Sequence, residues 1–232
     1  MNKLYKKNGY LVVKDFLSKT QVAEFRNLLD SFLTKDNSIS DDGVSKMIPG
    51  FADNYNELKE LNVLHKEPKL IDLLRSEIFD ETEFIFADHS DLHQNKTTGW
   101  HRDTYDYLLK DRGNGTQAGL WSEECHIIKV CFLLQDHSDN DYGLWFKPGT
   151  HKKGVKGLKQ VAYTNPTDVI IFDQRIEHSG QTKKPQYHEK YNQNRYLLTY
   201  AFGLNNEHTK IHTLGATLRQ NRQKNKKRKK DG

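Results

Sequence analysis

Cysteine and long apolar runs are scarce in this sequence. Its only two cysteines, Cys125 and Cys131, would lie about 20 Å apart on an extended segment, beyond the reach of a disulfide. We therefore exclude a disulfide framework and expect both thiols to be reduced and partly buried. No apolar run approaches the length of a membrane span, and residues 1–9 lack the apolar core of a signal peptide. These absences predict a soluble cytoplasmic protein.

The middle of the chain contains neither a linker-like segment nor an internal repeat. A length of 232 residues is ordinary for a single β-sandwich or barrel, and a hydrophobic content of 35% suffices for a core. We expect one domain over residues 1–218.

The positive net charge of +5 comes from the carboxyl end. Residues 219–232 hold eight of the 36 basic residues and one of the 31 acidic ones, which leaves 28 basic against 30 acidic residues elsewhere. A like-charged run without apolar residues is typical of a disordered tail. We expect such a basic tail at 219–232. Contact of this tail with nucleic acid or an anionic surface is the less favoured alternative.

Helices are predicted in the first third of the chain. Ser18 followed by Gln21 forms a capping-box pattern, and apolar residues then recur at three- and four-residue spacing up to Phe32. Pro68 opens a second amphipathic segment that extends to Ile78. Residues 38–50, rich in Ser, Asp and Gly, are expected to form a loop.

The pattern changes from Glu83 onward. Short β-rich runs alternate with polar loops, and no helix of comparable length is predicted again. The expected strands cover residues 83–87, 126–134, 168–172 and 195–203, with a further short run at 10–13. Helices followed by strands indicate a mainly β fold, a mostly antiparallel sandwich with flanking helices.

A metal site is indicated by Gly99-Trp100-His101-Arg102-Asp103. On an extended segment, His101 and Asp103 point to the same side and can each offer one ligand atom. His178 follows the buried strand expected at 168–172 and is the best third ligand. Two histidines and one carboxylate suit non-haem Fe(II) chemistry, because they leave one face of the ion open.

The His-x-Asp spacing occurs twice more in the sequence. His89 and Asp91 also end a strand-like run, and spacing alone gives them the same weight as His101 and Asp103. His137 and Asp139 lie in a run of turn-forming residues, which favours a solvated hairpin loop.

Family resemblance separates these alternatives. The ordered segments resemble the phytanoyl-CoA dioxygenase family of Fe(II)/2-oxoglutarate oxygenases over most of the chain. They are Lys96 to Asp103, Gly143 to His151, Val169 to Asp173 ahead of His178, and Arg195 with Thr199. The chain departs from the family at Thr150, where serine is usual, and in a polar insertion over 183–194.

The resemblance implies a double-stranded β-helix, the cupin-like jelly roll, with Fe(II) held by His101, Asp103 and His178. It also implies that Arg195 and Thr199 bind the distal carboxylate of 2-oxoglutarate. Lys96 matches a family lysine before the iron motif. Ascorbate is the candidate reductant, and dioxygen is the second cosubstrate.

Lys129 interrupts the apolar run from Ile127 to Leu134, so it must meet an anion if it points inward. An outward-pointing Lys129 would belong to the polar face of an edge strand. We count it with Lys96 as a further candidate for binding 2-oxoglutarate. His151 is expected to support the barrel.

The expected activity is hydroxylation of a C–H bond in a small organic substrate, with release of succinate and CO2. Asp103 favours hydroxylation over halogenation, since related halogenases lack the carboxylate ligand. Aromatic residues between Tyr105 and Glu124 would line a substrate pocket or form a satellite core, and nearby Lys110 and Arg112 suit an anionic substrate. The alternatives are a catalytically inactive barrel that acts as a binding module and a cupin-type isomerase or sugar-binding protein.

Overall fold

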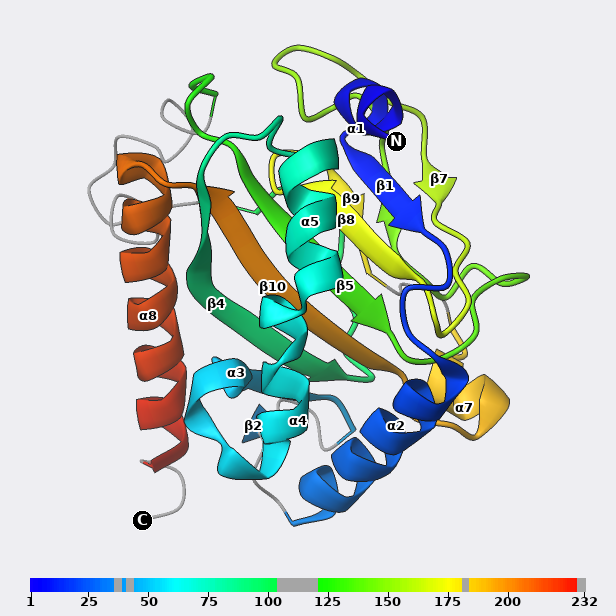
Figure 1. Ribbon diagram of the computed structural model, residues 1–232. Coiled ribbons are helices and arrows are strands. Elements are labelled where there is room, and N and C mark those ends of the chain that lie inside the picture. Colours follow the sequence, from blue (N-terminus) through cyan, green and yellow to red (C-terminus); the bar gives the residue numbers. More distant parts are fainter. Residues whose placement is uncertain (36–38, 41–43, 104–120, 181–183, 229–232) are drawn as a thin grey trace.

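Seven strands form the larger of two sheets in the computed structural model of the protein (Figure 1). The structure describes residues 1–35, 39–40, 44–103, 121–180 and 184–228. In the order of neighbours, the strands are β1 (Tyr10–Val13), β8 (Val169–Asp173), β5 (Ile127–Leu133), β10 (Tyr196–Leu204), β4 (Phe84–Gln94), β3 (Lys46–Pro49) and β2 (Ile39–Ser40). All of their pairings are antiparallel, and the first strand pairs Tyr10 with Phe172.

A smaller sheet faces the larger one. It consists of β7 (Gln160–Val161), β6 (Trp145–Phe146) and β9 (His178–Ser179). Phe146 from this sheet packs in one apolar cluster with Leu133 and Phe172 from the large sheet. Two facing antiparallel sheets with a shared core make a jelly roll, so the predicted fold class is confirmed.

The central strands β5 and β8 of the large sheet are buried on both faces. In β5, Ile128, Val130 and Phe132 join the apolar cluster beneath the helices, whereas Cys131 and Leu133 point into the space between the sheets. Alternation with period two explains this division, and burial on both faces explains why the run is almost uniformly apolar. Both cysteines are buried and free, as predicted.

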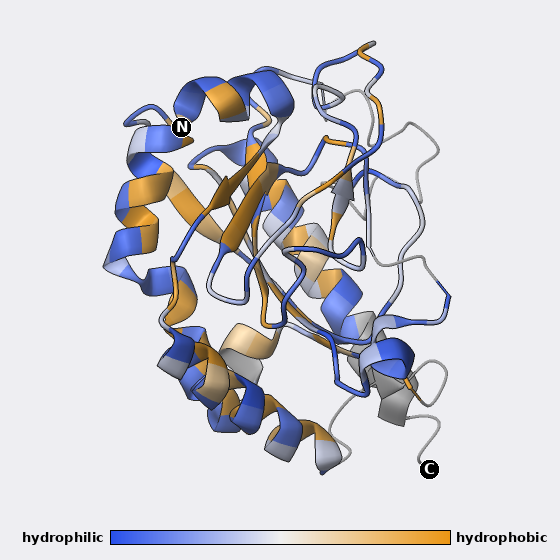
Figure 2. Cartoon of the chain, turned by 90° about the vertical axis from the view of Figure 1, so that its right-hand side faces the viewer, coloured by the Kyte–Doolittle hydropathy of each residue, from blue (hydrophilic) through white to orange (hydrophobic). Residues whose placement is uncertain are grey.

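Helices cover the outer face of the large sheet (Figure 1). They are α1 (Asn2–Asn8), α2 (Lys19–Thr34), α3 (Phe51–Asn54), α4 (Lys59–Asn62) and α5 (Pro68–Glu77), with two 3-10 turns at Asn56–Leu58 and Leu64–Lys66. Apolar residues concentrate on the central strands, and the surface loops are mostly hydrophilic (Figure 2).

The two predicted long helices begin where the sequence indicates. Ser18 caps α2 by accepting a hydrogen bond from the Gln21 backbone, and the Gln21 side chain returns a bond to the Ser18 backbone. Pro68 occupies the first turn of α5, where its missing N–H has no helical partner to lose. Both helices bury their apolar faces against the sheet.

The prediction of no further long helix is wrong. After the short helix α7 (Tyr187–Tyr191), α8 runs over Glu207–Arg228 and packs along β4 and β10. Figure 1 shows it upright beside β4. The boundary expected after residue 218 therefore falls inside α8, and Arg219 contacts Asp91 of β4. Several of the side chains that α8 turns toward β4 are polar, so apolar periodicity could not reveal it.

Two loop predictions also differ from the structure. Lys46–Pro49, expected within a loop, forms β3 because it pairs with β4. His137 is fully buried instead of solvated, held between the side chains of Gln135 and Asn140. The residues expected as an aromatic substrate wall at 105–120, with Lys110 and Arg112, lie outside the described residues.

Among the described residues, none of the helices combines the length and apolar character that crossing a bilayer requires.

Candidate metal centre

His101 and His178 are brought together by the backbone. The two residues form an antiparallel bridge in which each N–H donates to the carbonyl of the other, both at 2.9 Å. The Asp103 N–H donates to the Gln174 carbonyl at 3.1 Å and extends this pairing. The predicted motif thus runs antiparallel to the segment that leads into β9, and main-chain bonds fix its position.

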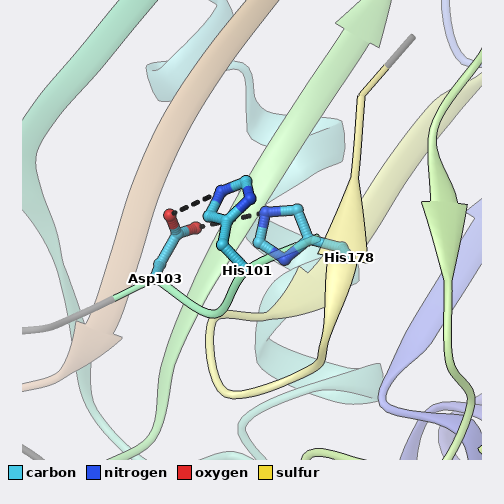
Figure 3. A group of neighbouring side chains, drawn as sticks. All are labelled: His101, Asp103 and His178. Carbon is cyan, nitrogen blue, oxygen red and sulfur yellow. Dashed lines mark ion pairs between the residues drawn. The ribbon is translucent and has the colours of Figure 1, made fainter. Parts of the chain in front are cut away.

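The side chains of His101, Asp103 and His178 converge (Figure 3). Their potential ligand atoms all lie within 4.8 Å of one another. The Nε2 atoms of His101 and His178 each stand 3.7 Å from an oxygen of Asp103. This separation exceeds a hydrogen bond, so the three groups surround a space that an ion can fill.

Both imidazoles are oriented by backbone carbonyls. His101 Nδ1 lies 2.8 Å from the Gly99 carbonyl, and His178 Nδ1 lies 3.0 Å from the Ile176 carbonyl. A carbonyl only accepts, so each Nδ1 carries the proton and each Nε2 keeps its lone pair. Metal-binding histidines characteristically have their second nitrogen fixed in this way.

The charges of the cluster also suit a cation. Burial lowers the pKa of His178 to about 4, which keeps this imidazole neutral near pH 7. Burial by itself would raise the pKa of Asp103, but Lys129, His178 and His101 outweigh it and hold the pKa far below the usual range. A neutral imidazole and an ionised carboxylate are the forms in which these groups bind metal.

The alternative pair has a different environment. Arg219 Nη2 donates to both oxygens of Asp91, at 2.9 and 2.8 Å. His89 contacts Asp91 through Nε2 at 3.1 Å and His212 through Nδ1 at 2.9 Å. Asp91 is therefore neutralised by a guanidinium, and within the described residues only His101, Asp103 and His178 group as potential metal ligands.

Arg195 supplies a buried cation to the same cavity, which has a volume of about 290 Å³. Its side chain is 1% exposed, and Nε donates to the Tyr142 carbonyl at 3.1 Å. Its Nη2 has no hydrogen-bond partner among the residues that the structure describes. Burial lowers the pKa of Arg195 to about 10, which still leaves it charged at neutral pH. A buried guanidinium of this kind requires an anion.

The other residues expected to bind the cosubstrate also line this cavity. Lys129 points inward, with Nζ 2.9 Å from Asp103 Oδ2. Thr199 Oγ1 donates to the Asp91 carbonyl at 3.3 Å, and Lys96 Nζ lies 3.6 Å from the sulfur of Met47. The structure thus gathers all seven predicted site residues around one cavity. His151 instead contacts the Lys6 carbonyl, remote from the triad.

Sequence reasoning missed several cavity residues. Arg219 was assigned to a tail, and His93 was not singled out. His93 follows Asp91 by two residues on β4 and faces the same cavity, a placement that strand periodicity could have indicated. No local signal connects Arg219 with Asp91, because 128 residues separate them.

Comparisons with known proteins agree with this architecture. A family model described as Phytanoyl-CoA dioxygenase (PhyH) matches residues 5–192. None of the curated proteins matches the sequence.

Solved structures of non-haem enzymes resemble the fold. The α-ketoglutarate-dependent epimerase SnoN from nogalamycin biosynthesis superposes with a TM-score of 0.66 and 14% identity, covering 87% of this chain and 80% of SnoN. HygX from Streptomyces hygroscopicus, with nickel and 2-oxoglutarate bound, superposes with a TM-score of 0.65 and 15% identity, covering 88% of this chain and 85% of HygX. The carbocyclase SnoK from nogalamycin biosynthesis superposes with a TM-score of 0.61 and 17% identity, covering 86% of this chain and 81% of SnoK. At these identities the likeness concerns the fold.

Proposed function

The chain belongs to the phytanoyl-CoA dioxygenase family, and on that premise we propose that it is an Fe(II)- and 2-oxoglutarate-dependent dioxygenase. The reaction that we propose is hydroxylation of a C–H bond in a small organic substrate, with release of succinate and CO2. Residues 1–218 would form its single domain, to which the helical residues after 218 add a wall.

The observation that carries this proposal is the state of the two histidines. Their Nδ1 atoms are tied to the carbonyls of Gly99 and Ile176, and their Nε2 lone pairs face the ionised Asp103. Lys129 pairs with one oxygen of this carboxylate, and the two imidazole Nε2 atoms stand 3.7 Å from its oxygens, a separation that a metal ion can bridge. His101, Asp103 and His178 therefore fit Fe(II), which accepts two histidines and one carboxylate and keeps positions open for other ligands.

The second part of the proposal assigns the cosubstrate to Arg195. A guanidinium binds a carboxylate through two parallel hydrogen bonds, and Arg195, whose Nη2 has no hydrogen-bond partner among the described residues, lines a cavity shared with the metal ligands. Thr199 lies on the strand that follows Arg195 and would add its hydroxyl. Lys96 and Lys129 would add positive charge around the same dicarboxylate.

When bound, iron with 2-oxoglutarate and dioxygen supplies the oxidising power to remove a hydrogen atom from an unactivated carbon. The protein's own residues bind and orient. Arg195 fixes the far end of the cosubstrate, and Lys129 holds Asp103 from the side through an ion pair. The apolar side chains of Leu144, Phe172 and Leu197 line the cavity and restrict water near the reacting groups.

The test is an anaerobic titration of the apoprotein with Fe(II) and then 2-oxoglutarate, followed by exposure to air. We expect a visible charge-transfer band on addition of 2-oxoglutarate and slow release of succinate without substrate. A protein that forms no band and releases no succinate would be a binding module and not an oxygenase. With a substrate found by screening, a product heavier by one oxygen atom distinguishes hydroxylation from epimerisation or ring closure.

A further inference from the structure

Helix α8 docks on an irregular part of β4. Ser90 of β4 pairs with Tyr200 of β10, but the next pairing joins Phe86 to Phe202, so residues 87–89 stand opposite Ala201 alone. Asp88 in this bulge has a φ of 45°, a left-handed conformation that is uncommon for residues other than glycine. Strained bulges inside strands typically re-aim side chains near functional sites.

The bulge is matched by contacts from α8. Thr213 Oγ1 donates to the Ala87 carbonyl at 3.0 Å. This bond gives a partner to a β4 carbonyl at the point where the pairing of β4 with β10 is interrupted. His212, one residue earlier, contacts His89 at 2.9 Å. Two turns later, Arg219 binds Asp91. The helix is thus attached to β4 by polar bonds at successive levels, and these bonds fix its position along the strand.

Three members of this interface line the metal cavity, namely His89, Asp91 and Arg219. His89 and Asp91 lie on β4 and Arg219 lies on α8, whereas the triad combines His178 of β9 with His101 and Asp103 of the segment that pairs with it. Lys129 lies between the two groups, since it pairs with Asp103 and its charge also acts on His89. The family model matches residues 5–192, so both β10 and α8 lie after the matched region.

The chemistry of this wall is polar without net charge. The carboxylate of Asp91 and the guanidinium of Arg219 neutralise each other, and Arg219 Nη2 also lies 2.9 Å from His89 Nε2. His93, on the same side of β4, has a buried Nδ1 without a hydrogen-bond partner among the described residues. Burial lowers the pKa of His93 to about 3, so this ring stays neutral.

We propose that Asp91, Arg219 and His93 form a positioning site for a neutral, polyhydroxylated part of the substrate, such as a sugar or cyclitol ring. The inference rests on the proposed dioxygenase function and names the substrate class for that site. Hydroxyl groups both donate and accept hydrogen bonds, so they can pair with a carboxylate, which accepts, a guanidinium, which donates, and an imidazole, which does both. An apolar group would desolvate these polar atoms without replacing their bonds. A charged group would meet one like and one opposite charge in the Asp91–Arg219 pair.

Arg219→Met and His93→Leu test the site, with Lys210→Met as the matched control. Lys210 lies on the same helix but forms an exposed pair with Glu207, away from the cavity. Arg219→Met leaves Asp91 as an unpaired buried charge and can unfold the protein, whereas His93→Leu removes no charge partner. Thermal melting of each variant identifies which of them are folded.

The probes are neutral methyl glycosides and inositols, compared with glucose 6-phosphate and glucosamine. Binding to the Fe(II)- and 2-oxoglutarate-loaded protein is measured without oxygen, by calorimetry and by the shift of the charge-transfer band. We expect at least one neutral ring to bind, with affinity reduced about tenfold or more in His93→Leu and in folded Arg219→Met. Lys210→Met should bind it within about twofold of the unmodified protein.

Three results would overturn the proposal: no neutral ring binds, the site variants bind as the control does, or the phosphorylated probe binds tenfold more tightly than the neutral rings. In each case a normal charge-transfer band with 2-oxoglutarate would leave the dioxygenase assignment intact. Loss of that band in the unmodified protein would instead refute the proposed function itself.

Discussion

Lys129 Nζ lies 2.9 Å from Asp103 Oδ2, so a cation touches the carboxylate of the candidate metal triad. Both side chains are 13% exposed, and the pair is therefore shielded from solvent screening. An inward lysine on β5 satisfies the requirement that a cation within an apolar run must meet an anion. The contact makes Lys129 the partner of Asp103, a candidate metal ligand.

Replacing Lys129 with Met should raise the pKa of Asp103, because the main charge that lowers it is removed. Metal binds the ionised carboxylate, so metal should be lost at a higher pH in Lys129→Met than in the unmodified protein. Mn(II) or Fe(II) affinity measured from pH 7.5 down to pH 5 reports this shift. If metal affinity falls at the same pH in the two proteins, Lys129 does not lower the pKa of Asp103.

Replacing Arg195 with Met should raise the dissociation constant of 2-oxoglutarate by more than about 30-fold, since truncating one partner of a buried charge pair costs about 2 kcal/mol or more. Lys129→Met is the matched control in the same cavity and should have a smaller effect. Titration of the anaerobic charge-transfer band measures both. An equal or larger effect of Lys129→Met would contradict the assignment of Arg195 as the residue that binds the cosubstrate carboxylate.

Asp103→Ala should abolish the charge-transfer band and succinate release, because one of three protein ligands is lost. Asp91 has the same His-x-Asp spacing but is bound by Arg219, so Asp91→Asn should retain the charge-transfer band. Metal content after reconstitution provides a second measurement. A normal band in Asp103→Ala with an absent one in Asp91→Asn would reverse the assignment of the triad.

Two truncations should differ sharply. Removal of residues 222–232 keeps Arg219 and should leave 2-oxoglutarate turnover intact. Removal of residues 219–232 also deletes the partner of Asp91 and leaves a buried carboxylate unpaired, which costs about 3 to 5 kcal/mol. Chemical denaturation and uncoupled succinate release compare the two proteins. Equal stability would mean that the Arg219 contact contributes nothing to holding α8.

The apoprotein should lose stability in mild acid. Burial lowers the pKa of His93 to about 3 and those of His137 and His178 to about 4, against an ordinary value near 6.5. Below pH 6.5 these histidines bind protons in the unfolded chain but not in the folded protein. The free energy of unfolding therefore falls as the pH drops toward 4. The shifts of His137 and His178 correspond to about 3 kcal/mol each at most, and that of His93 to about 5 kcal/mol at most.

Urea denaturation between pH 7.5 and pH 5 measures this slope. His137→Gln removes one of these groups at a residue that does not line the metal cavity, and should flatten the dependence of the free energy of unfolding on pH. A free energy of unfolding that is constant over this range would contradict the buried neutral state of these rings.

Much of the fold was predictable because its signals are local. The capping box at Ser18, the proline at position 68 and the apolar runs of β5 and β8 each encode an element within a few residues. The ligand motif was readable for the same reason, as His101 and Asp103 are neighbours in sequence. What brings His178 to them is a backbone bridge, which the spacing of residues does not encode.

The parts that escaped prediction depend on distant partners. His89 and Asp91 matched the ligand spacing equally well, and only Arg219 and His212 from α8 distinguish their role. That helix lacks a clear apolar stripe, because several of its contacts with β4 are polar. His137 resembled a solvated turn residue until Gln135 and Asn140 enclosed it.

The central place of β10 has a consequence for synthesis on the ribosome. β10 lies between β4 and β5, and it pairs with both along most of its length. Until residues 196–204 have left the exit tunnel, those two strands have no neighbour between them and expose unpaired edges to other nascent chains. The ligand residues are all translated before this strand. The cavity that joins them to Arg195 is therefore completed only after β10 has paired with both strands.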